Sequence, residues 1–252
     1  MNKTVLITGA TAGIGKATAM KFAENNYNII LTGRRKERLQ ELAKELEKFP
    51  IKVLSINFDV RKLEEVKAAF DSIPEDFKNI DILVNNAGLA AGLGTIDEGE
   101  IDNWERMIDT NIKGLLYVSK QVMPLMIKKG SGHIINIGSI AGKEVYLKGN
   151  VYCATKHAVD AISKSMRIDL LPYKIKVTNI NPGAVETEFS IVRLGGDAEK
   201  AAKVYEGFQP LLAHDIAEII YFAAIQPSHV NINDIVVTPT AQANTVHILK
   251  DL

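Results

Sequence analysis

Short apolar segments alternate with longer amphipathic segments along the whole chain. The apolar segments are nearly continuous in Val, Ile and Leu, which is typical of strands buried on both faces of a parallel sheet. The pattern predicts seven strands, at Thr4–Thr8, Asn28–Thr32, Lys52–Phe58, Ile82–Asn85, His133–Gly138, Lys176–Ile180 and Asp234–Thr238.

The segments between these strands carry apolar positions at helical spacing. They predict helices at Ile14–Asn25, Lys36–Lys48, Leu63–Ser72, Trp104–Lys129 and Tyr152–Leu171. Pro124 predicts a kink in the fourth of these helices. Parallel strands joined by right-handed helical crossovers favour a doubly wound arrangement, so the expected fold is α/β with a parallel seven-stranded sheet.

The chain contains no linker, repeat or low-complexity run that would divide it, so we expect a single domain over residues 1–252. Residues 187–212 interrupt the alternation of strands and helices. This segment follows the polar run Glu186-Thr-Glu and contains Gly195-Gly196. We expect it to be a mobile substrate loop over a site.

Composition narrows the function without identifying it. The 30 basic and 30 acidic residues cancel, so nothing suggests binding to nucleic acid or to an anionic membrane. The single cysteine, Cys153, excludes an internal disulfide. The chain has no apolar run of about 18 residues, and its first strand begins directly after Lys3, which predicts a cytoplasmic protein. The five histidines show no metal-ligand spacing, so no metal site is expected.

A glycine-rich turn follows the first strand, with Gly9, Gly13 and Gly15 preceding a helix. Small residues at such a turn let the backbone approach phosphate oxygens, and the positive end of the helix dipole favours their charge. The spacing Gly-x-x-x-Gly-x-Gly differs from the usual dinucleotide fingerprint, so an ordinary glycine-rich turn remains the alternative.

The end of the second strand indicates which dinucleotide would bind. NAD-binding chains usually place a carboxylate there, whereas this chain has Arg34 and Arg35 and no carboxylate until Glu37. Two guanidinium groups can bind a 2′-phosphate through paired hydrogen bonds, which predicts NADP as the cofactor. The alternative is that both arginines are solvated charges, although basic residues at a helix N-terminus oppose its dipole. Asp59 and Val60, after the third strand, could contact the adenine.

Tyr152 and Lys156 are four residues apart on a predicted helix and therefore project from one face. A nearby ammonium lowers the pKa of a phenol from its usual value of about 10 and makes it a better base. Ser139 ends the fifth strand, at the edge where doubly wound sheets bind ligands, and could hold the reacting oxygen. Asn111 could anchor a water that connects Lys156 to solvent, or it could simply be bonded to backbone.

Taken in order, the segments Thr8–Gly15, Asn85–Gly88, Asn111, Ser139, Tyr152 with Lys156 and Asn181-Pro-Gly183 resemble the short-chain dehydrogenase/reductase family. The resemblance implies a Rossmann fold, hydride transfer with a nicotinamide cofactor, a catalytic tetrad of Asn111, Ser139, Tyr152 and Lys156, and a homotetramer. Ala12 departs from the family pattern, because many NADP-dependent relatives carry a basic residue there. Selection of the 2′-phosphate is therefore left to Arg34 and Arg35.

The expected cofactor contacts are Gly9, Thr11, Gly13, Ile14, Gly15, Arg34, Arg35, Asp59, Val60, Asn86, Ala87, Gly88, Tyr152, Lys156, Pro182, Gly183, Val185 and Thr187.

Longer segments resemble a subgroup of this family, the NADP-dependent 3-hydroxy acid dehydrogenases that act on serine and L-allo-threonine. These segments are Leu31–Leu39, Met107–Asn111, His133–Gly138, Gly149–Tyr152, Thr187–Ser190 with Val192-Arg193, and His229–Asn233. The resemblance implies oxidation of the β-hydroxyl of a small carboxylic acid, with Ser139 and Tyr152 on the hydroxyl.

Arg193 is our candidate partner for the substrate carboxylate, because its planar fork suits that group, and an exposed arginine with no such role is the alternative. Two other functions remain open at this point. One is a broad carbonyl or 3-ketoacyl thioester reductase of the same family, and the other is a nucleotide-sensing protein without catalysis.

Overall fold

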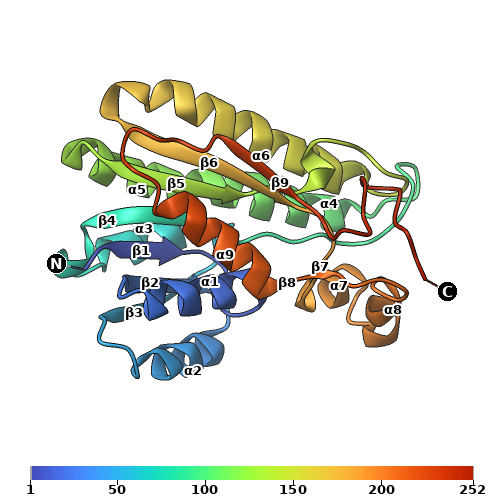
Figure 1. The fold of residues 1–252 in the computed structure, drawn as a ribbon, viewed down its shortest axis with the longest axis horizontal. Coiled ribbons are helices and arrows are strands. Elements are labelled where there is room, and N and C mark those ends of the chain that lie inside the picture. The colour runs from blue at the N-terminus through green and yellow to red at the C-terminus, as the bar shows by residue number, and fades with distance from the viewer. Residues whose placement is uncertain (1, 252) are drawn as a thin grey trace.

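The computed structural model describes residues 2–251, and seven strands in it form one parallel sheet in the order β3-β2-β1-β4-β5-β6-β9 (Figure 1). The strands are β1 (Thr4–Ile7), β2 (Asn28–Gly33), β3 (Val53–Asn57), β4 (Ile80–Asn85), β5 (Gly132–Ile137), β6 (Ile175–Pro182) and β9 (Asp234–Val237). The order reverses direction after β3, which is the doubly wound arrangement. The predicted fold class is confirmed.

Helices cover both faces of the sheet. One layer is α1 (Gly13–Glu24), α2 (Lys36–Leu46) and α9 (Ala213–Ala224), and the other is α3 (Leu63–Asp71), α5 (Leu115–Lys129) and α6 (Asn150–Asp169) (Figure 1). Successive strand residues point to opposite faces, so Ile7 packs in the first layer and Leu6 in the second. Both side chains are fully buried, which explains why the strands are apolar at consecutive positions.

The predicted helix Trp104–Lys129 is in fact three segments. They are α4 (Ile101–Ile108), a π-helical turn η2 (Asp109–Gly114) and α5, which continues through Pro124. A π-helical turn inserts an extra residue into the helical ladder without breaking it, so the apolar spacing alone did not reveal it. The prediction also missed α9, whose side chains Ile216 and Ile220 are fully buried against the first layer.

The segment 187–212 contains two short helices, α7 (Glu188–Arg193) and α8 (Ala198–Lys203). The two ends of this segment are joined by a short parallel pair of strands, β7 (Val185–Glu186) with β8 (Leu211–Leu212). The C-terminal residues after β9 return to the same region, where the Asp251 N–H donates to the Gly207 carbonyl over 2.8 Å (Figure 1). Short 3-10 turns complete the described elements: η1 (Glu75–Phe77), η3 (Ile140–Gly142) and η4 (Leu171–Tyr173).

Candidate active site

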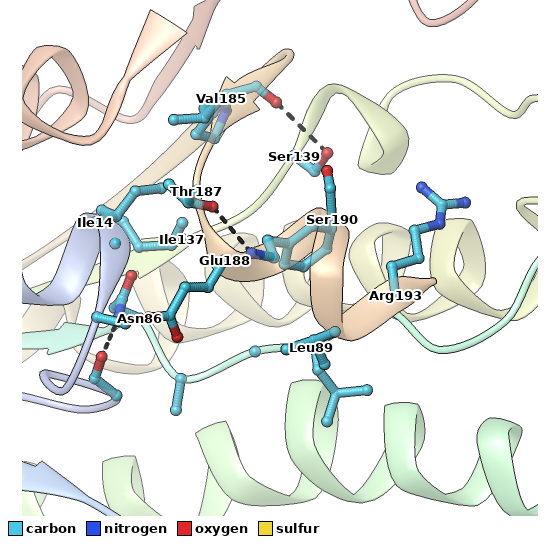
Figure 2. A pocket seen from close by; sticks show the side chains of 18 of the residues that line it. Ile14, Asn86, Leu89, Ile137, Ser139, Val185, Thr187, Glu188, Ser190 and Arg193 are labelled. Carbon is cyan, nitrogen blue, oxygen red and sulfur yellow. Dashed lines mark hydrogen bonds between the residues drawn. The ribbon is translucent and has the colours of Figure 1, made fainter. Parts of the chain in front are cut away.

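A cavity of about 530 Å³ opens at the carboxyl ends of the central strands, beneath α7 (Figure 2). This is the edge at which doubly wound sheets bind ligands. Of the site residues expected from sequence, all line this cavity except Gly15 and Asn111. The cavity therefore brings together side chains and turns from the first strand to the segment after β6.

The glycine-rich turn has the backbone shape that its glycines predict. Gly9 and Gly13 have φ values of +66° and +49°, in the left-handed region that residues with side chains rarely adopt. A Cβ on Gly15 would lie 2.3 Å from the Gly9 carbonyl oxygen, so Gly15 allows close packing behind the turn. Gly15 thus serves the site without lining the cavity.

The turn after β4 is bonded to the glycine-rich turn. The Asn86 amide donates to the carbonyls of Thr8 and Gly9 over 2.9 and 3.2 Å, and the Thr8 hydroxyl accepts the N–H groups of Asn86 and Ala87 over 3.0 Å each. These bonds hold the walls on either side of the crevice at a fixed separation. Asn86, the second residue of the motif Asn85–Gly88, therefore positions backbone.

The two arginines after β2 differ in their contacts. Arg35 donates to the Thr11 hydroxyl from Nε over 3.1 Å and from Nη2 over 2.9 Å, so its side chain lies across the glycine-rich turn. Arg34 also lines the cavity and is exposed, and none of the ion pairs among residues 2–251 includes it. The Asp59 carboxylate accepts hydrogen bonds from the Arg61 guanidinium. Burial works against its charge, but hydrogen bonds from Arg61 hold the pKa of Asp59 below its usual value.

These features fit NADP. The turn brings backbone to the cavity without intervening side chains, because Gly9 and Gly13 both line it. Two guanidinium groups stand where a carboxylate would repel a 2′-phosphate. The cavity passes from these arginines to Ser139, Tyr152 and Lys156, as a dinucleotide with its reactive ring at the far end would require.

Asn111 lies in the π-helical turn η2, a feature that often marks functional positions. Its side chain is 2% exposed and makes two bonds with the Leu89 backbone, accepting its N–H over 2.9 Å and donating to its carbonyl over 2.9 Å. It also donates to the Thr155 hydroxyl over 3.0 Å. The side chain is therefore bonded mainly to backbone, as the alternative interpretation held.

Lys156 projects from α6 toward the same place. Its Nζ donates to the Ile137 carbonyl over 2.9 Å. A Cβ built on Gly88 would lie 3.3 Å from Asn111 Oδ1 and 3.6 Å from Lys156 Nζ, so these two groups meet around Gly88. The side chains of Asn111 and Lys156 are thus neighbours of the Gly88 backbone.

Tyr152 and Lys156 face one another across one turn of α6. Lys156 Nζ lies 5.9 Å from the centroid of the Tyr152 ring. Ser139 caps the start of η3, where its hydroxyl accepts the Ala141 N–H over 3.1 Å and donates to the Pro182 carbonyl over 3.5 Å. Ser139 and Tyr152 line the same cavity.

Burial dominates the protonation of this pair. It raises the pKa of Tyr152 well above the usual value, while Ser139 and Arg193 exert smaller effects in the opposite direction. Burial also lowers the pKa of Lys156 to about 8. A phenol that ionises near neutrality was the expectation from sequence, and it is wrong for the protein alone. Both groups lie in one desolvated site, and withdrawal from water disfavours either charge.

Arg193, the last residue of α7, points into the cavity from the opposite side (Figure 2). The carbon of its guanidinium group lies 5.6 Å from the Tyr152 ring centroid and 5.3 Å from that of Tyr146. Among residues 2–251, its buried Nε has no hydrogen-bond partner. A buried donor without a partner is uncommon in folded proteins and suits an anionic ligand.

Several residues of the cavity were not expected from sequence. The Tyr146 ring lies 5.3 Å from the guanidinium carbon of Arg193, and Gln242 reaches the site from the C-terminal segment. The Gln242 Oε1 accepts the Ala184 N–H over 2.8 Å and is 58 residues away along the chain. No local pattern distinguishes such a residue, because its position depends on how the C-terminal segment folds back.

Comparison with known proteins agrees with this geometry. A sequence model described as short chain dehydrogenase matches residues 3–193. An NADP-dependent 3-hydroxy acid dehydrogenase of Salmonella typhi is 48% identical over 95% of this chain and 96% of its own. A sulfoacetaldehyde reductase of Chromohalobacter salexigens is 44% identical over 96% of each chain. The solved closed form of a serine dehydrogenase complexed with NADP+ is 43% identical, with a TM-score of 0.93, and the match covers 99% of this chain and 100% of that one.

The chain belongs to the short-chain dehydrogenase family. It is an NADP-dependent oxidoreductase, which sets aside the nucleotide-sensing alternative. Within residues 2–251 no helix is long and apolar enough to cross a membrane. The same residues contain no group of three or more His, Cys, Asp or Glu side chains placed to hold a metal ion.

Proposed function

We propose that this enzyme transfers hydride between NADP and the β-hydroxyl of small 3-hydroxy acids such as L-serine or L-allo-threonine. The observation that carries the proposal is the guanidinium of Arg193, which faces the Tyr152 ring at 5.6 Å and has a buried Nε without a partner. An arginine there can bind a carboxylate one or two carbons from the reacting hydroxyl.

The roles of the other residues follow from their positions. Ser139 holds the substrate oxygen, and Tyr152 accepts its proton on oxidation or returns it on reduction. Lys156, with a pKa of about 8, is mostly protonated at neutral pH and places a cation 5.9 Å from the centroid of the phenol ring. Asn111 fixes the Leu89 backbone and keeps η2 against α6. The glycine-rich turn, Arg34 and Arg35 hold NADP, which supplies the hydride acceptor of oxidation or the hydride donor of reduction.

We further propose that residues 187–212 form a mobile substrate loop and that the chain assembles as a homotetramer. Gly195 and Gly196, which follow α7 and have positive φ values, support the mobile loop. The family resemblance supports the homotetramer. A sulfonate is a second possible anion, because Arg193 offers the same donors to either group and one relative is named a sulfoacetaldehyde reductase. A substrate panel separates these compounds.

The test compares kcat/KM for L-serine, L-allo-threonine, an acetoacetyl thioester, sulfoacetaldehyde and an uncharged alcohol. The proposal expects the hydroxy acids to be preferred, and a preference for the thioester would favour the broad reductase instead. Arg193→Met should raise KM for L-serine about tenfold to a hundredfold, the value of a lost charged hydrogen bond. The uncharged alcohol should be little affected.

Lys203→Met is the matched control, because Lys203 is an exposed cation in the same segment. Equal effects of Arg193→Met on L-serine and on the uncharged alcohol would refute the assigned role of Arg193.

A further inference from the structure

Glu188, the first residue of α7, contacts two arginines. Arg38 belongs to α2, and Arg35 is the residue just before that helix. Its Oε2 accepts Nη1 of Arg35 over 2.9 Å, and its Oε1 accepts Nη1 of Arg38 over 2.7 Å. Arg38 Nη1 also reaches Oε2 over 2.9 Å. The contact joins segments that are 150 or more residues apart in sequence.

The contact continues to the glycine-rich turn. Arg35 donates its Nε and Nη2 to the Thr11 hydroxyl, so one guanidinium binds both that turn and the start of α7. An arginine side chain has five N–H donors, and these bonds use three of them. The remaining donors are free for a phosphate. Arg35 can therefore contact a 2′-phosphate while it holds Glu188.

Helix α7 connects this contact to the substrate end of the site. Glu188 and Arg193 are the first and last residues of the helix, and they leave it in different directions (Figure 2). Glu188 points toward the arginines after β2, whereas Arg193 points into the cavity beside Tyr152. A shift at one end of so short a helix must move the other end, because the two are separated by less than two turns.

Charge favours this arrangement. The hydrogen bond from Arg35 is the largest of the effects that hold the pKa of Glu188 below its usual value, so the carboxylate is ionised at neutral pH. A negative side chain in the first turn also complements the helix dipole. Each of the three side chains is a little over two-fifths exposed, so one such pair contributes little, and the shared network is what gives the contact its value.

We propose that Arg35, Glu188 and Arg38 form a latch that holds α7 closed over NADP and so positions Arg193 for the substrate anion. Glu188 is a positioning residue in this proposal, because it acts through the helix and touches neither substrate nor the reacting atoms. The proposal rests on the carboxylate role proposed for Arg193 and on Arg35 as a cofactor contact. It adds a physical link between recognition of the cofactor and placement of the substrate arginine.

Other contacts keep α7 folded when the latch is opened. The Ser190 hydroxyl lies 2.6 Å from the Tyr205 hydroxyl, which donates to the Val185 carbonyl over 2.8 Å. The Thr187 hydroxyl accepts the Phe189 N–H over 3.3 Å at the start of the helix. Glu188→Gln should therefore leave the fold intact while it removes the charge from the latch.

The test measures amide hydrogen exchange of residues 188–203 together with steady-state kinetics, both in the presence of NADP. Glu188→Gln should speed exchange of this segment about twofold to fivefold, the range for exposed ion pairs. KM for L-serine should rise by a similar factor, with a smaller change in kcat. Glu199→Gln, an exposed carboxylate of α8, is the control and should change neither.

A double-mutant cycle decides between a latch and a general structural effect. Arg38→Met should speed exchange and raise KM in the same direction as Glu188→Gln, and the double variant Arg38→Met with Glu188→Gln should resemble Glu188→Gln alone, because both changes remove the same contact. Unchanged exchange in Glu188→Gln, or a double variant whose effect is the product of the two single effects, would overturn the latch. The exchange readout does not depend on Arg193, so failure of the carboxylate role, seen with Arg193→Met, is distinguishable from failure of the latch.

Discussion

Burial of the charged Lys156 side chain lowers the folding stability of the protein, and its pKa gives the size of this effect. Lys156 is 6% exposed, and burial lowers its pKa from 10.5 to about 8. Below pH 8 the lysine is protonated in both the folded and the unfolded chain, and the folded state carries the full penalty. A shift of about 2.5 pH units corresponds to about 3 kcal/mol of folding free energy. Between pH 8 and 10.5 the unfolded chain binds more protons, so stability rises with pH across this window.

Lys156→Met removes the penalty and also removes the bond to the Ile137 carbonyl. A hydrogen bond from a charged group contributes about 2 kcal/mol, so the variant should be about 1 kcal/mol more stable than the wild type at pH 7. For a chain of this length the difference corresponds to a rise in Tm of about 3 °C. The advantage should shrink as the pH rises toward 10, because the wild-type lysine then becomes neutral in the unfolded chain as well.

The assay is thermal unfolding followed by circular dichroism at pH 7 and at pH 9.5, together with kcat for oxidation of L-serine. The variant should be more stable at pH 7 and lose activity by about a hundredfold or more, since the cation beside the phenol is gone. Lys44→Met, an exposed lysine of α2, should change neither quantity. A less stable Lys156→Met at pH 7, or a gap that does not depend on pH, would refute this account of the site.

Two further predictions concern the cofactor and the core. Arg34→Met should raise KM for NADP about tenfold and leave KM for NAD nearly unchanged. Parallel titrations of the two cofactors measure this difference. An equal rise in KM for both cofactors would contradict the 2′-phosphate role of Arg34. Burial lowers the pKa of His133 to about 3, so stability should fall as the pH drops below 6.5, where only the unfolded chain binds the proton. His133→Gln should reduce the loss of folding stability between pH 7 and pH 5 by about 2 kcal/mol, which is followed through Tm at the two pH values. The same loss of stability in the variant and in the wild type would contradict this prediction.

The sequence predicted the sheet because its strands are buried on both faces. Leu6 and Ile7, with opposite directions, are both inaccessible to solvent, and the same holds for Ile30 and Leu31 in the next strand. Such consecutive apolar positions give a signal that depends on no distant contact. The glycine-rich turn was equally clear, since the positive φ of Gly9 and Gly13 requires glycine for local reasons.

The elements that sequence analysis missed depend on tertiary contacts. The π-helical turn η2 has the same apolar spacing as the helices on either side of it, so the extra residue is invisible in the pattern. Gln242 enters the cavity only because residues after β9 fold back over Gly183 and Ala184. The pairing of Glu188 with Arg35 and Arg38 joins the start of α7 to the segment after β2, and no local rule connects residues so far apart.

The two cations beside Tyr152 make different contributions to the reaction. Arg193 lowers the pKa of the phenol, but a substrate carboxylate bound to Arg193 would neutralise that effect at the moment of reaction. Among residues 2–251, Lys156 Nζ is hydrogen-bonded only to the uncharged Ile137 carbonyl, so its charge is not cancelled when substrate enters. Loss of Arg193 should therefore appear mainly in KM and loss of Lys156 mainly in kcat. The distinction follows from which cation the substrate anion can reach, and both variants already described measure it.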